Sequence, residues 1–385
     1  MSFYQVGLLG DATPEQLQVL QDEIVQLVKP LGIMAELEFV LPDATFAPQP
    51  DYSLVGILFG GDCSKLDPAS LQSLMRHGTP IIPVVGDLTS FAKLVPACLH
   101  HINGLKLDPA DKKLTRVATA ALECMGLLPR QRRIFLSYRR TEAREAGLQL
   151  FEHLTSRHFD VFLDTHSVAP AEDFQEVLWH RLSDSDVLVM LDTQTYFENR
   201  WTNEEFGRAL AKSLSPVRLG WPGVAPAPRS FAAESIQLEA NDFQPGASIL
   251  SADALARATI AIERVRSRGI AVRGLELTSA VANGVEKIDG EFLGLGPKRT
   301  IIIELPDGHK VLVFPSVGVP TSEHLHQTAV LNATSDSRAV VYDDAGVGSQ
   351  WQTHLKWLGQ EIKSVKWLKM GRVSWELAAW PREHQ

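Results

Sequence analysis

Short apolar runs alternate with amphipathic helical patterns along the first 270 residues, and this alternation constrains the fold more than any other feature. One such helix is expected at residues 13–32, with Thr13 as its N-cap, Pro14 in its first turn and Gly32 just past its end. Strand–helix alternation predicts an open parallel sheet covered by helices on both faces, which is the α/β class. The strands expected in the first part of the chain are residues 3–10, 35–40, 53–61 and 80–86.

The pattern restarts after residues 127–133, a basic joint that contains a proline. Strands at 133–140, 160–165 and 187–193 again alternate with helical patterns, so a second α/β unit of similar size is expected, closed by a long helix at 252–269. The likeness between the two units is one of pattern and only suggests a tandem duplication. Because 385 residues are too many for one core, two or three domains are expected, and the patterns divide the chain into three. They span residues 1–129, 130–270 and 271–385.

The third domain has a different pattern, and a β-hairpin is its clearest element. Residues 299–315 hold two apolar runs separated by a turn with Asp307 and Gly308 at its centre. A strand that runs into a loop is expected at 338–346, and a helix at 349–359. Roughly a hundred residues are enough for an independent core. We therefore expect a small α+β or α/β accessory domain here.

Charge and composition exclude several classes of function. The net charge of −9 argues against a nucleic-acid binder, because phosphate contacts need a basic surface. The three cysteines fit neither a zinc site nor a disulfide framework, so a reducing compartment, the cytoplasm, is expected. The histidines at 100–101 and 324–326 lack the spacing of a metal site. No signal peptide is recognised, and the apolar runs are too short to span a membrane.

The middle unit resembles a TIR (Toll/interleukin-1 receptor) domain. Residues 133–140, "RIFLSYRR", look like the first strand of that family and the loop after it. Residues 159–206 follow the family's order through a second strand, the BB loop, a helix, a third strand and a helix that begins with a tryptophan. The resemblance implies a flavodoxin-like parallel sheet. It also suggests that residues 1–129 are a degenerate, inert unit of the same kind.

Some members of this family cleave NAD+ at the bond between nicotinamide and ribose. Their essential glutamate lies in a W-x-x-x-E arrangement, which Trp201 and Glu205 match here. The resemblance therefore implies that Glu205 is catalytic and that NAD+ is a substrate rather than a cofactor. A carboxylate stabilises the positive charge that develops on the ribose as nicotinamide leaves. Attack by water gives ADP-ribose, and attack by an adenine nitrogen gives a cyclic isomer; the sequence does not choose between them.

Glu205 also has a purely structural interpretation. If Thr202 is the N-cap of the helix, Glu205 is the N3 residue of a capping box, "TNEE". A glutamate there also favours the helix dipole, by under ~1 kcal/mol. Spacing alone favours the capping interpretation, and the resemblance reverses that order. The neighbouring Glu204 is expected to be a solvated acid of the first turn.

Further site residues are expected at the carboxyl ends of the strands, where open parallel sheets bind ligands. Arg139 or Arg140 is a candidate for contact with the diphosphate of NAD+ through its guanidinium group. The equal alternative is that both are surface arginines, one of them paired with Glu142. Ser137 is small enough to let the ligand approach, and Tyr138 either packs on a ligand ring or fills the strand end.

Two more candidates follow the later strands. Asp164 lies at the carboxyl end of the strand at 160–165, where it either bonds to a ribose or, as we prefer, anchors the BB loop. Trp201 is expected to pack beside the pocket rather than to stack on the ligand.

The resemblance also implies self-association, because in this family the BB loop of one copy completes the pocket of the next. Residues 165–173 are expected at such a contact, and head-to-tail contacts of this kind extend into open arrays. A role in anti-phage defence or cell-death signalling is implied, with the third domain as a sensor or an oligomerisation module. The alternative is a non-enzymatic adaptor that recruits partners through TIR–TIR contacts. The expected partners are NAD+ and further copies of the chain, not nucleic acid or a membrane.

Overall fold

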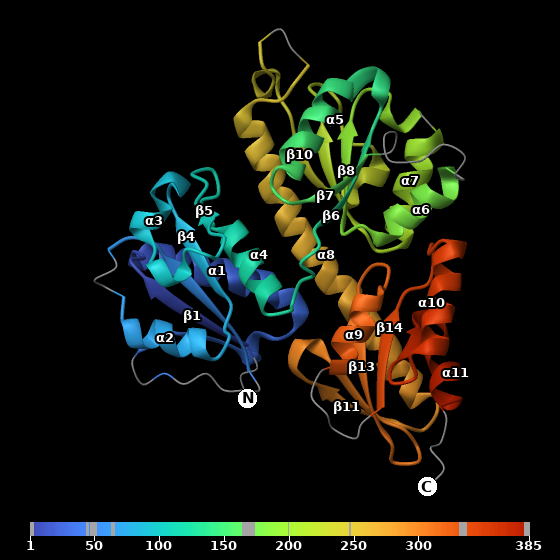
Figure 1. The fold of residues 1–385 in the computed structure, drawn as a ribbon. Helices are drawn as coiled ribbons and strands as arrows, with labels where there is room; N and C mark the ends of the chain where they lie inside the picture. Colours follow the sequence, from blue (N-terminus) through green and yellow to red (C-terminus); the bar gives the residue numbers. More distant parts are fainter. Residues whose placement is uncertain are drawn as a thin grey trace. The chain divides into compact units, whose positions relative to one another are not determined.

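The computed structural model arranges the described residues around three five-stranded sheets (Figure 1). Contacts divide the chain into two compact units, the first comprising residues 1–130 and 259–267 and the second comprising 131–258 and 268–385. The described residues are 4–43, 46, 52–62, 66–163, 174–198, 200–245, 248–330 and 337–380, and the side chains at 174, 175, 200–203 and 205 lie outside this description.

The first unit holds a parallel sheet in the order β2-β1-β3-β4-β5. The expected N-cap of its first helix is confirmed: Oγ1 of Thr13 accepts from the backbone N–H of Gln16, and the Gln16 side chain accepts from the N–H of Thr13. The elements are β1 (Tyr4–Gly10), α1 (Pro14–Val28), β2 (Leu37–Val40), β3 (Ser53–Phe59), α2 (Pro68–Arg76), β4 (Ile81–Val85), α3 (Phe91–Leu94), β5 (Leu105–Lys106) and α4 (Thr115–Cys124).

The second unit begins with another all-parallel sheet, in the order β10-β9-β8-β6-β7. Counted from its own first strand, this order is the same 2-1-3-4-5 as in the first unit, so the expected flavodoxin-like architecture is confirmed for both sheets. The elements are β6 (Arg133–Tyr138), α5 (Arg140–Thr155), β7 (Asp160–Leu163), α6 (Phe174–Asp184), β8 (Val187–Asp192), α7 (Arg200–Ala211), β9 (Ser215–Gly220) and β10 (Glu234–Gln237).

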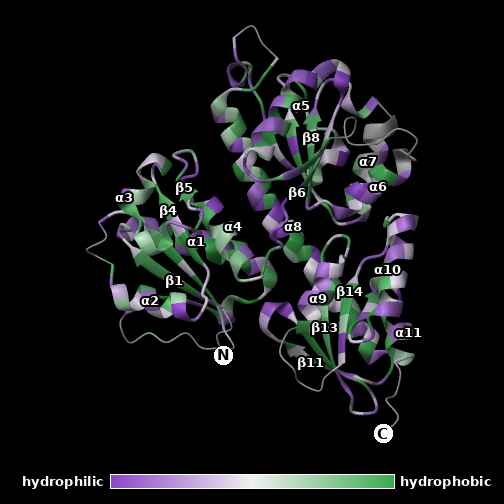
Figure 2. Ribbon diagram, viewed as in Figure 1, coloured by the Kyte–Doolittle hydropathy of each residue, from purple (hydrophilic) through white to green (hydrophobic). Residues whose placement is uncertain are grey.

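The core of this sheet follows from continuous apolar runs. Every residue of β6 and β8 is buried, as expected for central parallel strands covered on both faces. The hydropathy colouring shows the same division, with hydrophobic strands and helices whose colour alternates along their length (Figure 2). Helices α6 and α7 bury Leu178, Leu182 and Phe206 against Phe135 and Leu188.

A mixed sheet in the order β11-β12-β13-β14-β15 completes the second unit. The expected hairpin is confirmed, because β12 and β13 are antiparallel and Gly308 in their turn has a φ of 82°. Strands β13, β14 and β15 are parallel. The elements are β11 (Glu291–Leu295), β12 (Ile301–Glu304), β13 (Lys310–Ser316), α9 (Ser322–Val330), β14 (Ser337–Tyr342), α10 (Ser349–Glu361), β15 (Lys366–Lys369) and α11 (Val373–Ala378).

One long helix, α8 (Ala252–Glu286), precedes this mixed sheet. The expected end of this helix at residue 269 is wrong. Gly269 does not end the helix; a Cβ atom there would lie 2.8 Å from Oγ of Ser215, so the glycine allows α8 to approach β9 closely. The helix crosses residue 270, and the domain boundaries suggested by the sequence stay a prediction. Among the described helices, none is both long and apolar enough to cross a bilayer.

Candidate functional site

The order of the middle sheet places a topological switch point between β6 and β8. Strand β6 pairs with β7 on one side and with β8 on the other, so the connections that follow β6 and β8 leave in opposite directions. Ligands of open α/β sheets bind at the carboxyl ends of such strands. The residues that follow β6 and β8 therefore form the candidate site, and they are Arg139–Glu142 and Thr193–Glu198.

Ser137 and Tyr138, the last two residues of β6, are both buried. Oγ of Ser137 lies 2.8 Å from the phenolic oxygen of Tyr196, which follows β8. Tyr138 packs on α5, where a Cβ atom added to Gly147 would lie 3.1 Å from its ring. Both residues thus join β6 to its neighbours. Whether either one contacts a ligand stays a prediction.

Arg139 is held by the turn after β8. Its Nη1 atom donates to the carbonyl oxygen of Thr195 at 2.8 Å and also to the Thr195 hydroxyl, and it lies 3.9 Å from Oε2 of Glu198. Within the described residues, Nε and Nη2 of Arg139 make no hydrogen bond, and 30% of the side chain is exposed. The guanidinium group is therefore held through Nη1, while the N–H groups of Nε and Nη2 remain available as donors.

Glu142 also lies at this site, although the sequence did not single it out as a site residue. Its Oε1 atom accepts from the Thr195 hydroxyl at 2.6 Å, and Oε2 accepts from the Thr195 backbone N–H at 3.3 Å. Burial pushes the pKa of Glu142 upward, but the Thr193 hydroxyl, the hydrogen bonds from Thr195 and the charge of Arg139 outweigh burial and leave the pKa below its ordinary value. A stable carboxylate therefore lies at the switch point.

Arg140 differs from Arg139 in its surroundings. It is the first residue of α5 and is exposed, and its guanidinium group makes no hydrogen bond to any part of the chain that the structure describes. The backbone of α5 departs from helical geometry at Ala143, with φ of −133° and ψ of 24°, so Arg140–Glu142 form a turn set off from the main helix. The two arginines thus play different parts, one held and one free.

Helix α7 begins at Arg200, which corrects the structural interpretation of Glu205. Thr202 is the third residue of the helix and not its N-cap, and no acidic residue lies in the first turn. The capping-box alternative does not fit this helix start, and Glu205 falls in the second turn. The side chains of Trp201 and Glu205 lie outside the described residues, as do Asp164 and the whole of 164–173, so their expected roles stay predictions.

The start of α7 is fixed to the carboxyl end of β8 by aromatic packing. Phe197 meets Tyr196 and Phe206 edge-on, with ring centroids 4.9 and 5.6 Å apart. The guanidinium carbon of Arg208 lies 3.5 Å from the ring centroid of Trp179, in a cation–π contact between α7 and α6. The first turns of α7, which contain Glu205, therefore stand beside the switch point.

A buried ion pair joins β8 to β9. Arg218 on β9 is fully buried, and its Nε lies 2.5 Å from Oδ2 of Asp192 at the end of β8. The guanidinium group also donates to Ser235, Gln237 and the carbonyl oxygen of Val224. Because each of its three nitrogens donates within the domain and the side chain is fully buried, Arg218 holds the strand ends together and is not a candidate ligand contact.

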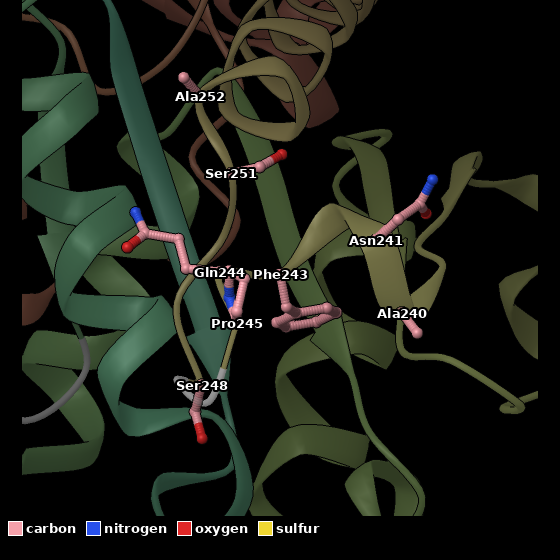
Figure 3. Close-up of a pocket in the computed structure, with 8 residues that line it drawn as sticks. All are labelled: Ala240, Asn241, Phe243, Gln244, Pro245, Ser248, Ser251 and Ala252. Carbon is pink, nitrogen blue, oxygen red and sulfur yellow. The ribbon is translucent and has the colours of Figure 1, made fainter.

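An open cavity of about 790 Å³ lies beside the segment that follows β10, which is an edge strand of the sheet (Figure 3). Its lining is apolar or uncharged and comes from the segment between β10 and α8 and from the first residue of α8. The lining residues are Ala240, Asn241, Phe243, Gln244, Pro245, Ser248, Ser251 and Ala252. None of the described lining residues is titratable, and β10 is two strands removed from β8 at the switch point, so this cavity is not the site that the sheet order indicates.

Comparison with known proteins agrees with this geometry. The family model described as "TIR domain" matches residues 134–250, which include the middle sheet, its switch point and α7. The chain contains a TIR domain. No curated protein matches the sequence.

Solved structures with some similarity to the chain include the TIR domains of the activated Roq1 resistosome that recognises the pathogen effector XopQ. The identity is 20%, the match covers 24% of this chain and 58% of that chain, and the TM-score is 0.22. Proximal thread matrix protein 1 from the mussel byssus is 10% identical, with 61% and 90% of the two chains covered and a TM-score of 0.22. A LacI transcriptional regulator from Bacteroides fragilis is 11% identical. The match covers 60% of this chain and 80% of that chain, and the TM-score is 0.19.

Within the TIR domain, the described site residues come from three segments that are distant in sequence. The Arg139–Glu142 turn follows β6, the Thr193–Glu198 turn follows β8, and α7 follows that turn directly. The mixed sheet after α8 contacts the same domain through α6 and the end of α7, where Lys212 Nζ lies 2.5 Å from Oδ2 of Asp343. Helix α7 therefore takes part in the candidate site at its start and leads into the contact with the mixed sheet at its end.

Proposed function

We propose that the TIR domain cleaves NAD+ at the bond between nicotinamide and ribose, with the Glu205 carboxylate as the catalytic group. The observation that carries the proposal is the position of the W-x-x-x-E arrangement. Trp201 and Glu205 lie inside the TIR-matched residues, on the helix that enters from the carboxyl end of β8 at the switch point. Glu205 is past the first turn of α7, so helix capping does not account for an acid there.

The chemistry requires little more than a placed negative charge. As the bond between ribose C1′ and the nicotinamide nitrogen breaks, its electron pair passes to nicotinamide, which leaves as a neutral molecule. Positive charge then develops on the ribose ring, and a carboxylate close to it stabilises the transition state more than the ground state. Water adds at C1′ and loses a proton, which gives ADP-ribose; attack by an adenine nitrogen gives a cyclic product instead.

The arginines after β6 suit the other half of the substrate. A diphosphate accepts hydrogen bonds in the fork geometry that a guanidinium group offers. Arg139 keeps Nε and Nη2 without a partner among the described residues, and Arg140 is exposed beside it. We infer that these two side chains bind the diphosphate while Glu205 faces the ribose.

Activity is proposed to depend on self-association through the TIR domain, in a defence or cell-death role. The 165–173 segment, which falls outside the described residues, is the proposed contact. Helix α6 follows this segment directly, and Glu176 of α6 accepts a hydrogen bond from Ser349 of α10, beside the mixed sheet. This contact is consistent with control of self-association by the part of the chain that forms the mixed sheet.

The test compares NAD+ consumption by the full chain with that by Glu205→Ala and by Glu204→Gln, under crowding that favours association. Glu204 is the matched control, since it is the adjacent acid of the same helix. We expect Glu205→Ala to lose about 100-fold or more of the rate, and Glu204→Gln to keep it. Equal turnover by Glu205→Ala would exclude this mechanism, and no turnover by any form would favour the adaptor alternative.

A further inference from the structure

We propose that Glu142 is a positioning residue of the TIR site, which acts through Thr195 to hold the Arg139 guanidinium group in place for a diphosphate. The proposal deepens the proposed function and rests on it for the class of ligand. It concerns a carboxylate other than Glu205, and it assigns that carboxylate a task in binding rather than in bond cleavage.

Hydrogen bonds link Glu142 to the turn after β8. Both carboxylate oxygens of Glu142 accept from Thr195, at 2.6 Å from the hydroxyl and at 3.3 Å from the backbone N–H. Two hydrogen bonds from one residue fix both its backbone and its side chain. The first turn of α5 therefore sets the position of the Thr195 carbonyl and hydroxyl oxygens, although the two segments are 53 residues apart in sequence.

Thr195 in turn is hydrogen-bonded to Arg139. Nη1 of Arg139 donates to the carbonyl oxygen of Thr195 at 2.8 Å and to the same hydroxyl that donates to Glu142. The result is a chain in which the guanidinium donates to a hydroxyl and the hydroxyl donates to a carboxylate, and each bond polarises the next. Glu198, the other acid near Arg139, is largely exposed and 3.9 Å away, so it holds Arg139 less firmly.

The edge of the Arg139 guanidinium group that carries Nε and Nη2 is the part proposed to meet the ligand. Because Nη1 makes every described contact, Nε and Nη2 keep parallel donors, which match two oxygens of a diphosphate. A guanidinium group that is already fixed loses less conformational entropy on binding than a free one. Arg140, which lacks such contacts, offers the matched comparison on the same turn.

The charge of Glu142 alone would have the opposite effect on the binding of a diphosphate. Glu142 is ionised, and a negative charge near an anion site weakens anion binding by Coulomb repulsion. If Glu142 acted only through its charge, its removal would strengthen the binding of a diphosphate. If it positions Arg139, its removal weakens that binding.

The experiment measures the affinity of the full chain for ADP-ribose, which has the diphosphate but no bond to cleave, and for adenosine, which has no phosphate. We expect Glu142→Ala and Arg139→Ala each to weaken ADP-ribose binding by about ten-fold, the loss of one charge-assisted interaction. Adenosine binding should not change. The double variant should bind no more weakly than Arg139→Ala, because Glu142 acts only through Arg139.

Two further variants keep the test valid if Glu142→Ala unfolds. Thr195→Val removes the hydroxyl relay but keeps both charges, and it should weaken ADP-ribose binding in the same way. Glu145→Gln removes an exposed acid from the same helix and should leave binding unchanged. Unchanged or tighter ADP-ribose binding by Glu142→Ala, additive losses in the double variant, or no binding of ADP-ribose by the wild type would overturn the proposal.

The outcomes separate this proposal from the proposed function. A wild type that binds ADP-ribose in the expected pattern but never consumes NAD+ would support the role of Glu142 and refute cleavage. Consumption of NAD+ that depends on Glu205, with ADP-ribose binding indifferent to Glu142, would support cleavage and refute the role of Glu142.

Discussion

Oε1 of Glu176 on α6 accepts from the backbone N–H of Ser349 at 2.5 Å, so a side chain of the TIR domain caps the first turn of α10 in the mixed sheet. Gly348, the N-cap residue of α10, has no side chain with which to do this. The loop before α10 lies directly on α6, because a Cβ atom added to Gly346 would come within 2.2 Å of Oγ of Ser183. The contact therefore leaves no room for a larger residue.

Loss of this cap should destabilise α10. Glu176→Ala is expected to cost about 1 kcal/mol of unfolding free energy, the usual value of a capping side chain. Amide hydrogen exchange in the first turn of α10 and urea unfolding of the full chain measure the effect. Glu361→Ala, which changes an exposed acid at the other end of the same helix, is the control and should not destabilise, since an acid there opposes the helix dipole. Equal effects of both changes would contradict the capping role.

The contact between α6 and α10 should weaken in acid through His180. Nδ1 of His180 accepts from the backbone N–H of Gly348 at 3.3 Å, which requires the neutral ring. Burial lowers the pKa of His180 below 6.5; Arg181 lowers it further, while Asp184 and Glu176 oppose this. Between that lowered pKa and 6.5 the unfolded chain binds the proton more readily, so stability is lost as the pH falls through this window.

Thermal unfolding from pH 7.5 to pH 5.5 measures this effect. His180→Asn should lose less stability over this range than the wild type, because asparagine keeps an acceptor and does not titrate. Burial also lowers the pKa of His324, so a part of the wild-type slope should remain in the variant. His101→Asn, at an exposed position, should keep the full slope. An unchanged slope in His180→Asn would show that the ring does not titrate differently on folding.

The buried pair of Arg218 and Asp192 should be far more sensitive to loss of one partner than of both. Asp192→Asn leaves the Arg218 charge buried without a counterion, which typically costs about 3–5 kcal/mol. Asp192→Leu combined with Arg218→Met removes both charges and should cost less than Asp192→Asn. Urea denaturation of both variants provides the comparison. A double variant that is less stable than Asp192→Asn would mean that the other hydrogen bonds of Arg218 dominate.

Glu205 should contribute little to stability. It lies in the second turn of α7, where alanine is the residue most favourable to a helix, so Glu205→Ala should change the unfolding free energy by less than about 0.5 kcal/mol. Thermal unfolding midpoints of the variant and the wild type check this. A loss of more than about 1 kcal/mol, the usual cost of a lost cap, would restore the capping interpretation and would confuse any loss of activity with unfolding.

The sequence predicted the elements whose signals are local. The capping box at Thr13, the Asp307–Gly308 hairpin and the buried strands β6 and β8 each depend on residues that are near one another in the chain. The end of α8 was missed because Gly269 serves a contact with Ser215, and a glycine that allows close approach looks the same in a sequence as one that ends a helix.

The candidate site was predictable only in part, for the same reason. The arginines after β6 stand out because they follow an apolar strand. Glu142 does not, since its partner Thr195 lies 53 residues away and is recognised only once β6 and β8 are neighbours. The capping interpretation of Glu205 failed because helix starts are set by the backbone before the first turn, and α7 begins two residues before Thr202.

Helix α8 has a consequence for the order in which the chain is able to fold. Residues 259–267 group with the first unit, where Arg266 donates to Glu123 at 2.8 Å and Glu263 lies 3.7 Å from Arg116. During synthesis, residues 1–130 therefore leave the ribosome before residues 259–267 exist. The first unit is completed only after the whole TIR segment has been synthesised. A fragment cut at residue 130 would lack this closing piece and expose the buried groups that it covers.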